Sequence, residues 1–532
     1  MNTKLDDQIS QNRKELERRP PGNIGRAQAL YNLAESVRKR SKKTNAGADI
    51  DEAIAVHRQA LDLRPTGHPD RHWSLYWLAW CLHDRYQKQR TPPDLEESIT
   101  LGRAALDLRP AGHPGRSNSL HGLAVCLCDR YIKRDSIADL EEAIILDRAA
   151  LELRPPGNAD RALTLCNLAV SLRRIFLKLS VTADIDEAIS LHRSTLDLRP
   201  KGHPNRSDSL HALALCFSDR YDKQASLADL DEAITLYRVA LELRPPGHSG
   251  RALTLCNLAV NLRRRSLKLG ATTDIDEAIS LHRSALDLRP EGHPKRSNSL
   301  HFLALCFSDR YDTQVSIVDL EEAITFGRAA LELRPPGHSD RVWTLNNLGL
   351  DLRHRFLKLS AIADIDDAIL LHRSALDLRP EGHPYRSDSL HNLALCFSDR
   401  YDKQASVADL QEAITLGRAA LELRPQGHSD RATTLYHLAL DLRHRFLKLS
   451  ANADIDEAIS LHRSGLNLHP VGHSDRLVSL NQLASCLGLR FEKLEAPADL
   501  NDLIILNRDI LDLHPLGHDG RIKSIDGLLL HL

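Results

Sequence analysis

A proline recurs every 45 residues along this 532-residue chain, and no insertion or deletion breaks the register. The prolines are Pro20, Pro65, Pro110, Pro155, Pro200, Pro245, Pro290, Pro335, Pro380, Pro425, Pro470 and Pro515. A glycine follows each of them two positions later, from Gly22 to Gly517, and an arginine follows six positions later. A period of this length is typical of stacked repeats, in which each unit packs only against its neighbours. The chain is therefore expected to fold as a repeat array and not around one central core.

Each 45-residue unit contains two helical patterns, which the unit 245–289 illustrates. The first stripe consists of Leu255, Leu258, Ala259, Leu262 and Leu269. The second stripe consists of Ile275, Ala278, Ile279, His282 and Leu286. Both follow helical spacing, and the first helix should run about 20 residues. We therefore predict an all-α fold, an α-solenoid of 45-residue helix–turn–helix units.

The start and the end of the second helix carry their own signals. Asp274 precedes Ile275 and is followed three residues later by Glu277, which resembles a capping box with Asp in place of Ser or Thr. The pattern recurs in most other units, for example at Asp319/Glu322. The end is marked by Arg-Pro-x-Gly, because proline cannot continue a helix and glycine permits a positive φ.

The array begins and ends in the middle of a unit. Residues 1–19 match a second helix alone, residues 20–514 form eleven full units of one solenoid, and residues 515–532 match a truncated first helix. The last five residues are apolar, whereas solenoids normally end in a polar cap. We expect a further C-terminal region, a partner or a second copy of the chain to cover this end, so self-association there is one hypothesis.

Charge and composition argue against several classes of partner. The 71 Lys and Arg residues balance 72 Asp and Glu residues, so the chain has no general attraction to nucleic acid or to an anionic membrane. We find no signal peptide and no apolar stretch of about 18 residues, so no membrane partner is expected. Nine cysteines without a secretory signal favour a reducing compartment, and we predict a cytoplasmic protein.

The units resemble tetratricopeptide repeats. The positions that carry the resemblance are Leu255, Leu258, Ala259, Ala278, Ala285 and Pro290, which match the packing positions of that motif in order. The period exceeds the 34-residue norm, and the turn Gly-His-Pro followed by Ser-Leu-His-x-Leu-Ala is most similar to the longer repeats of the kinesin light chain type. The resemblance implies a right-handed superhelix whose groove is lined by the first helices. Similar arrays are often joined to a CHAT or nucleotide-binding effector domain, which these 532 residues do not contain.

Histidines at fixed repeat positions raise a metal hypothesis. Ten lie in the turn, namely His68, His113, His203, His248, His293, His338, His383, His428, His473 and His518. Successive turns should lie roughly 10 Å apart, too far for ligands that must lie about 2 Å from one ion. Asn23 and Asn158 replace histidine in two turns, and Asn is a favoured N-cap. We therefore interpret these histidines as capping or turn residues, and we predict no metal and no cofactor.

Other recurring histidines and the cysteines are interpreted as core residues. The histidines lie on the apolar face of second helices, at His192, His282, His372 and His462. The cysteines at one first-helix position are Cys81, Cys126, Cys216, Cys306, Cys396 and Cys486, and Cys166 and Cys256 share another. A small buried hydrophobe explains these cysteines without a redox role.

Every second helix carries an arginine at one position, including Arg193, Arg238, Arg283 and Arg328. An acid follows each of these four residues later, at Asp197, Glu242, Asp287 and Glu332. Such pairs contribute only a few tenths of a kcal/mol on an exposed helix. A structural ladder between neighbouring repeats is the main interpretation, and binding of phosphate or another anion by the arginines is the alternative.

The candidate binding residues lie on the first helices, which the resemblance places along the groove. A polar residue precedes the Leu-Ala pair at Asn167, Asn257, Asn347 and Asn392, and an asparagine amide can hold the backbone of an extended peptide. Farther along in alternate units lie Arg173, Arg263, Arg353 and Arg443, and the intervening units offer Asp219, Asp309 and Asp399. The groove would then carry alternating basic and acidic rungs that select a ligand of matching charge spacing. The alternative is a solvated face with local ion pairs.

No catalytic signature accompanies the repeats. The chain has no G-x-S-x-G, no Walker loop, no H-E-x-x-H and no dinucleotide fingerprint, so we predict that it is not an enzyme. The predicted function is a scaffold that binds a protein or peptide in the groove. The alternatives are a regulatory or sensor segment of a larger effector protein and an oligomerising structural rod.

Overall fold

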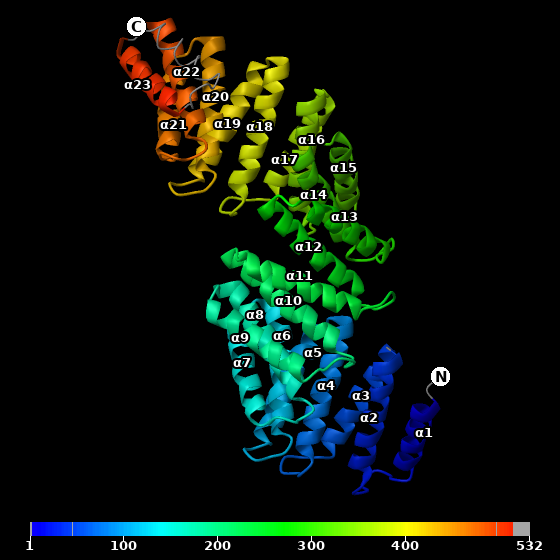
Figure 1. The fold of residues 1–532 in the computed structure, drawn as a ribbon. Coiled ribbons are helices and arrows are strands. Elements are labelled where there is room, and N and C mark those ends of the chain that lie inside the picture. Colours follow the sequence, from blue (N-terminus) through cyan, green and yellow to red (C-terminus); the bar gives the residue numbers. More distant parts are fainter. Residues whose placement is uncertain (1–2, 45, 496, 514–532) are drawn as a thin grey trace. The chain divides into compact units, whose positions relative to one another are not determined.

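In the computed structural model, residues 3–44, 46–495 and 497–513 are described, and they form 23 α-helices and no strand (Figure 1). The chain opens with α1 (Thr3–Glu17). The first helices of the repeats are α2 (Arg26–Thr44), α4 (Arg71–Gln89), α6 (Arg116–Arg134), α8 (Arg161–Leu179), α10 (Arg206–Gln224), α12 (Arg251–Leu269), α14 (Arg296–Gln314), α16 (Arg341–Leu359), α18 (Arg386–Gln404), α20 (Arg431–Leu449) and α22 (Arg476–Leu494). The second helices are α3 (Gly47–Asp62), α5 (Pro92–Asp107), α7 (Ile137–Glu152), α9 (Thr182–Asp197), α11 (Leu227–Glu242), α13 (Thr272–Asp287), α15 (Ile317–Glu332), α17 (Ile362–Asp377), α19 (Val407–Glu422), α21 (Asn452–Asn467) and α23 (Pro497–Leu513). The predicted all-α fold of paired helices is confirmed.

The chain divides into two compact units, Met1–Asn261 and Leu262–Leu532, and the division falls within α12. Helix α1 lies where a lone second helix is predicted for residues 1–19, and it packs against α2. Residues 515–532 lie outside the described residues, so the truncated helix and the self-association predicted there stay predictions. One continuous solenoid over residues 20–514 stays a prediction as well.

Each helix packs against the next helix along the chain from α1 to α11 and from α13 to α23. First helices of successive repeats also contact each other, as α2 with α4 and α16 with α18 do, whereas second helices come less close to one another over the described residues. The first helices therefore lie on the inner side of each stack.

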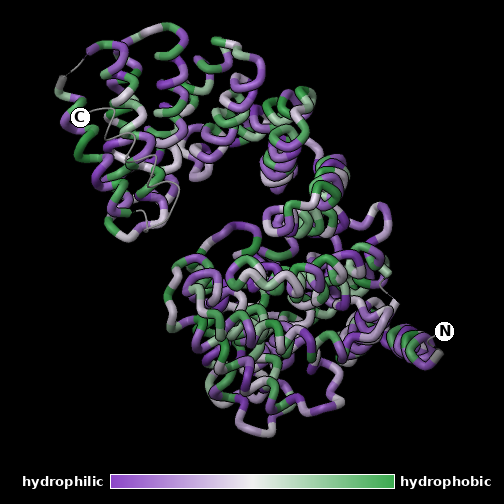
Figure 2. The backbone as a smooth tube through the Cα atoms, turned by 45° about the horizontal axis from the view of Figure 1, so that its top comes forward, coloured by the Kyte–Doolittle hydropathy of each residue, from purple (hydrophilic) through white to green (hydrophobic). Residues whose placement is uncertain are grey.

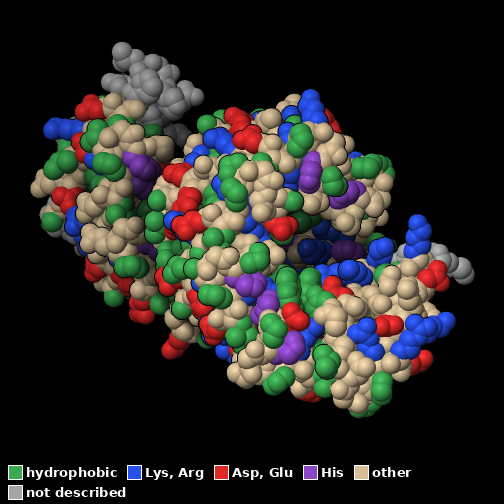
Figure 3. Space-filling view, turned by 90° about the horizontal axis from the view of Figure 1, so that it is seen from below, with side chains coloured by type: hydrophobic (Ala, Val, Ile, Leu, Met, Phe, Trp, Pro, Cys, Tyr) green, Lys and Arg blue, Asp and Glu red, His purple; other side chains and the backbone are tan. Residues whose placement is uncertain are grey.

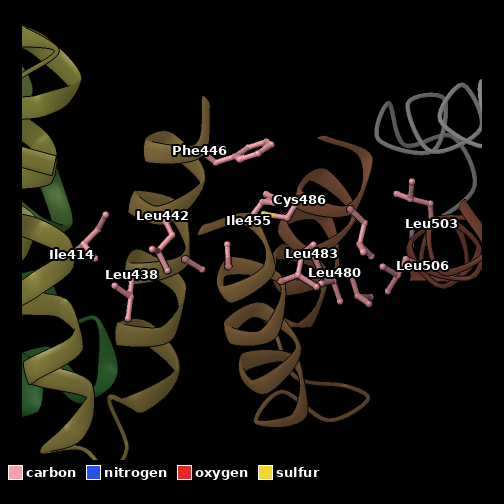
Figure 4. Close-up of a cluster of buried hydrophobic side chains, with 14 of the residues drawn as sticks. Ile414, Leu438, Leu442, Phe446, Ile455, Leu480, Leu483, Cys486, Leu503 and Leu506 are labelled. Carbon is pink, nitrogen blue, oxygen red and sulfur yellow. The ribbon is translucent and has the colours of Figure 1, made fainter. Parts of the chain in front are cut away.

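The core consists of aliphatic side chains contributed by adjacent helix pairs. Hydrophobic and hydrophilic residues alternate along the helices, which makes each helix amphipathic (Figure 2). In the second unit, Leu438 of α20, Ile455 of α21 and Leu483 of α22 belong to one buried cluster with exposed fractions of 0–3% (Figure 4). Each such side chain contributes roughly 1.5–3 kcal/mol of hydrophobic stabilisation. The stack is thus held together by contacts between neighbours.

The turn between repeats ends each second helix from α3 to α21 as predicted. Helix α13 ends at Asp287, and the glycine two positions after the proline, Gly292, has a φ of 80° that an L-residue with a side chain rarely adopts. The connection between the two helices of one repeat uses a different left-handed residue. The residue after the first helix is left-handed in most repeats and is rarely glycine, as Val315 with a φ of 55° illustrates.

No helix of the described residues combines the length and apolar character needed to cross a membrane.

The predicted N-cap role of Asp274 is wrong. Helix α13 begins at Thr272 after the extended residue Ala271, so Asp274 lies inside the first turn. Its carboxylate accepts hydrogen bonds from Nε and Nη2 of Arg265 at 2.7 and 2.8 Å. The aspartate thus recurs because it ties the second helix to the first helix of the same repeat.

Candidate functional site

The asparagines predicted for the groove lie half-buried on the inner first helices. Nδ2 of Asn167 on α8 lies 3.3 Å from Nε2 of His121 on α6, and Asn257 makes the same contact with His211. An amide that donates one N–H to a histidine keeps its oxygen and its second N–H for a ligand. Asn347 of α16 and Asn392 of α18 occupy the same repeat position and are half-buried. These side chains are therefore placed to contact a ligand, although such binding stays a prediction.

The predicted rungs of alternating charge pair with each other between adjacent first helices. Nε of Arg173 donates to Asp219, and Arg353 makes the same bond to Asp399. Arg263 contacts Asp309 through two nitrogens, of which Nη2 lies 3.1 Å from Oδ1. Burial raises the pKa of Asp399, and the guanidinium of Arg353 opposes that rise. Each arginine is thus neutralised by its aspartate, which agrees with the alternative of local ion pairs. On the face seen in Figure 3, basic and acidic side chains are likewise interspersed.

Arg443 on α20 is the exception among these arginines. The residue 46 positions later, where the other three have an aspartate, is Leu489. Nε of Arg443 is buried and has no hydrogen-bond partner among the residues that the structure describes. The last arginine of the series is therefore the one whose charge is not already matched by its neighbour.

In each compact unit, aliphatic side chains recur on these helices three residues after the asparagine position. We call them the aliphatic row, and its half-buried members are Val125, Val170, Leu215 and Val260 in the first unit and Leu305, Leu350, Leu395 and Leu440 in the second unit. Between α6 and α8, Val125, Val170 and Asn167 line a cavity of about 150 Å³ together with Asp129 and Arg174. The candidate binding surface thus combines an apolar stripe with polar groups at its edges.

The interpretation of the histidines is confirmed for the described turns. Nδ1 of His68 accepts a hydrogen bond from the backbone N–H of Asp70 at 3.0 Å, and the other described turn histidines do the same two residues on. Asn23 and Asn158 replace this bond with their side-chain oxygens. His518 lies outside the described residues.

The second-helix histidines and seven of the eight cysteines are buried as predicted, whereas Cys166 is only half-buried. His192 and His282 are fully buried, and burial lowers the pKa of His192 to about 4, so its ring is neutral at pH 7. Cys216 is buried, and burial raises the pKa of its thiol to about 12. Such a thiol behaves as a small hydrophobe and not as a nucleophile.

The arginine ladder on the second helices is confirmed, but its partners differ from the acids four residues on. Arg328 pairs with Asp367 of the next second helix at 3.1 Å. The same step of 39 residues recurs at Arg13–Glu52, Arg58–Glu97, Arg103–Glu142, Arg148–Glu187, Arg418–Glu457 and Arg463–Asp502. Arg193 and Arg283 instead lie over the rings of Phe217 and Phe307, at 5.6 and 5.4 Å from the ring centroids.

Two recurring arginines have structural roles that sequence reasoning missed. One belongs to the first helix, where Arg310 binds Asp319 bidentately at 2.9 and 2.6 Å and reaches Asp276 of the preceding repeat at 2.7 Å. The other directly precedes nine of the repeat prolines and is buried, as Arg334 is with 2% of its surface exposed. The recurrence of both arginines at fixed repeat positions was the signal in the sequence that could have revealed these roles.

One group of potential metal ligands lies in the turn before α22. Ligand atoms of His469, His473 and Asp475 fall within 4.8 Å of one another. However, Nδ1 of His473 accepts the N–H of Asp475 at 3.1 Å. A neutral imidazole that accepts at Nδ1 carries its proton on Nε2, so His473 has no free lone pair for a metal while this bond persists. That leaves two ligands, fewer than the three or four protein ligands of typical zinc sites.

Comparison with known proteins agrees with the repeat architecture. The model of a tetratricopeptide repeat family matches residues 386–430, and no curated protein matches the chain. The match covers one 45-residue repeat, and the same sequence pattern recurs in the other units, so the chain is built of units similar to tetratricopeptide repeats.

Three similar solved structures illustrate the range of repeat proteins. The human IFIT1 dimer with PPP-AAAA is 14% identical, covers 90% of this chain and 94% of its own, and has a TM-score of 0.41. BtubC (BKLC) from P. vanneervenii is 19% identical, covers 46% of this chain and 89% of its own, and scores 0.34. A putative kinesin light chain of Podosopora anserina with nearly identical TPR-like repeats is 18% identical, covers 41% of this chain and 98% of its own, and scores 0.31.

Proposed function

We propose that this protein is a non-catalytic scaffold that binds a polypeptide partner along the first-helix face of its repeats. The observation that carries the proposal is the cavity between α6 and α8, which brings Asn167 together with Val125 and Val170 of the aliphatic row. Peptide-binding sites commonly combine apolar contact area with a few polar groups that fix orientation. The tetratricopeptide fold is typically a scaffold, which supports the absence of a catalytic role.

The chemistry of the face favours an extended or helical segment with spaced apolar side chains. Such side chains pack on the aliphatic row, and the free donor and acceptor of Asn167 serve the partner's backbone amides. The closed pair of Arg353 with Asp399 offers little net charge. Arg443 is the group best suited to a partner carboxylate, because it lacks the aspartate that matches its counterparts.

The test is affinity capture from native cell extract with matched variants. Leu395→Glu places a charge on the aliphatic row, whereas Leu370→Glu places the same charge on α17 at a side chain that is 61% exposed. We expect Leu395→Glu to lose the partner and Leu370→Glu to retain it, with unchanged helical circular dichroism and melting for both. Equal recovery by both variants, or recovery of RNA in place of protein, overturns the proposal.

The other hypotheses make different predictions. An oligomerising rod requires self-association, so light scattering across a concentration series should show growth in mass with the purified chain alone. A segment of a larger effector protein requires that the coding region continue beyond Leu532 into another domain. The scaffold proposal predicts a partner that is captured by a monomeric chain.

A further inference from the structure

A buried arginine precedes nine of the repeat prolines, and Nη1 of each donates to the Ser or Thr hydroxyl ten residues later. The nine are Arg64, Arg109, Arg154, Arg199, Arg244, Arg289, Arg334, Arg379 and Arg424, with exposed fractions of 0–6%. In Arg424, Nη1 donates to the carbonyl oxygen of Asp430 at 3.2 Å and to Oγ1 of Thr434 at 2.5 Å, and Nη2 donates to Asp388 at 2.8 Å. Arg334 repeats this pattern with Asp340, Thr344 and Asn298.

We call this setting the guanidinium cradle, and it is defined by three repeat positions. They are the carbonyl six residues after the arginine, the Ser or Thr ten residues after it, and the residue 36 positions before it. Where that last residue is aromatic, the guanidinium lies over the ring, as Arg379 does at 5.2 Å from the ring centroid of Trp343. That residue is a carboxylate for Arg244 and Arg424 and a leucine for Arg199 and Arg289. The planar fork thus makes its bonds through the Nη atoms, while Nε of seven of the nine arginines is buried without a partner among the described residues.

The tenth cradle in the series lacks its arginine. His469 occupies that position. Four residues earlier stands Gly465, and the equivalent position in α13, α15, α17 and α19 is an alanine, namely Ala285, Ala330, Ala375 and Ala420. The shorter side chains leave a cavity of about 200 Å³ between α20, α21 and the start of α22. His469 reaches Ser479 at 2.8 Å through Nδ1, which replaces one of the missing bonds and leaves the others unmade.

The walls of the cavity are the remaining parts of the cradle. Asp475 supplies the carbonyl six residues on, Ser479 the hydroxyl ten residues on, and Thr433 the residue 36 positions back, and all three line the cavity. Tyr436 and His462 add aromatic walls. Nε2 of His462 is buried without a partner in the described part of the chain, and the residue is 3% exposed. Burial lowers the pKa of His462 to about 4, so this nitrogen is uncharged at neutral pH.

We propose that this cavity is a binding site for an alkylguanidinium group, which takes the place of the missing arginine. Its N–H groups donate to the carbonyl of Asp475 and to Oγ1 of Thr433, and its charge faces the exposed carboxylate of Asp475. The ring of Tyr436 offers a surface for cation–π contact. The same protein holds a guanidinium in nine equivalent places, so the recognition chemistry is already present.

The charged surroundings of the cavity define its selectivity. Nη1 of Arg476 is engaged with the carbonyl of His469 at 2.7 Å, as its counterparts are in other repeats. Besides burial, the charge of Arg443 lowers the pKa of His462. A lysine ammonium lacks the planar fork that the cradle fits and is more strongly hydrated. The site is therefore expected to prefer guanidinium over ammonium groups.

The decisive experiment is calorimetric titration with N-acetyl-arginine-methylamide and with the matching lysine compound. We expect the native chain to bind the arginine compound and His469→Arg to lose binding by at least about tenfold, because its own guanidinium fills the cradle. His469→Arg should melt no lower than the native chain, so the loss would not reflect unfolding. Equal binding by His469→Arg, equal binding of the lysine compound, or no binding by the native chain overturns the proposal.

A second variant and a second probe identify the contacts and the source of the ligand. Thr433→Val removes one acceptor and should weaken binding, whereas Thr415→Val, at an exposed threonine of α19, should not. If both variants bind equally, the cradle is not the site. Free arginine is compared with a Gly-Arg-Gly peptide blocked at both ends. Preference for the peptide assigns the ligand to a partner polypeptide, and preference for free arginine assigns it to a small molecule.

Discussion

Replacing Arg310 by Met removes a guanidinium that joins three helices and keeps much of the alkyl stem that packs beneath it. Arg310 donates two hydrogen bonds to Asp319 and one to Asp276. The side chain of Asp319 is 6% exposed and that of Arg310 is 22% exposed. Breaking a fully buried pair costs about 3–5 kcal/mol, and a surface pair contributes about 0–1 kcal/mol. We therefore expect a loss of about 2–3 kcal/mol for this partly exposed pair.

The chain contains its own control for this prediction. In α8 the equivalent residue is Ile175, so Asp184 has no arginine at the position that serves Asp319. Asp319→Asn should cost about 2 kcal/mol, whereas Asp184→Asn should fall within about 0.5 kcal/mol of the native chain. Both carboxylates lie in the first turn of a helix, so the contribution of the helix dipole cancels in the comparison.

Amide hydrogen exchange is the appropriate assay, because repeat arrays open locally and one global unfolding energy is not well defined. Protection should fall first in α14 and α15 and their neighbours. A double-mutant cycle of Arg310→Met with Asp319→Asn isolates the pair. A coupling below about 0.5 kcal/mol, or equal losses for Asp319→Asn and Asp184→Asn, would refute the assignment of the pair as a main tie between the helices.

Three further predictions follow from particular residues. Val315→Gly should stabilise the chain by roughly 0.5–1 kcal/mol in thermal melts, because a β-branched residue is strained at positive φ, and destabilisation would contradict this. Burial raises the pKa of Asp351 to about 7 in the folded chain, whereas the unfolded value is about 3.9. The protonated side chain therefore stabilises the fold fully below about pH 3.9, and this stabilisation is lost as the pH rises toward 7. Asp351→Asn should therefore melt higher than the native chain at pH 8 and flatten the pH dependence, and a lower melting temperature at pH 8 would count against a neutral buried carboxyl. Leu489→Asp should give Arg443 the partner that its counterparts have and weaken capture of the binding partner, and unchanged capture would exclude Arg443 from the site.

The repeat period and the apolar stripes were sufficient to predict the helix pairs, because spacing alone determines which residues share a helix face. Turn histidines were also predictable, since Asn23 and Asn158 reveal the hydrogen-bond acceptor that the position needs. The start of the second helix was not predictable from the sequence. Asp274 has the local features of a cap, but its partner Arg265 lies on another helix, and nine residues of separation give no local signal for that contact.

The positions of the candidate residues on the first helices were predictable, whereas the ion pairs between them were not. Sequence analysis placed Asn167, Arg353 and Asp399 on first helices, where they lie. It could not show that Arg353 and Asp399 close on each other, because this depends on how adjacent repeats are staggered. The buried arginines were hidden for a related reason. A residue such as Arg334 next to a turn proline has the features of a helix terminus until its three distant acceptors are known.

The most direct test of the central claim places a photo-crosslinking amino acid at Leu395 on the first-helix face or at Leu370 on the second-helix face. Crosslinking is carried out in native extract, and adducts are identified by mass. We predict a specific polypeptide adduct from position 395 that is absent from position 370. An adduct formed only from position 370, or equally from both positions, would contradict binding along the inner helices.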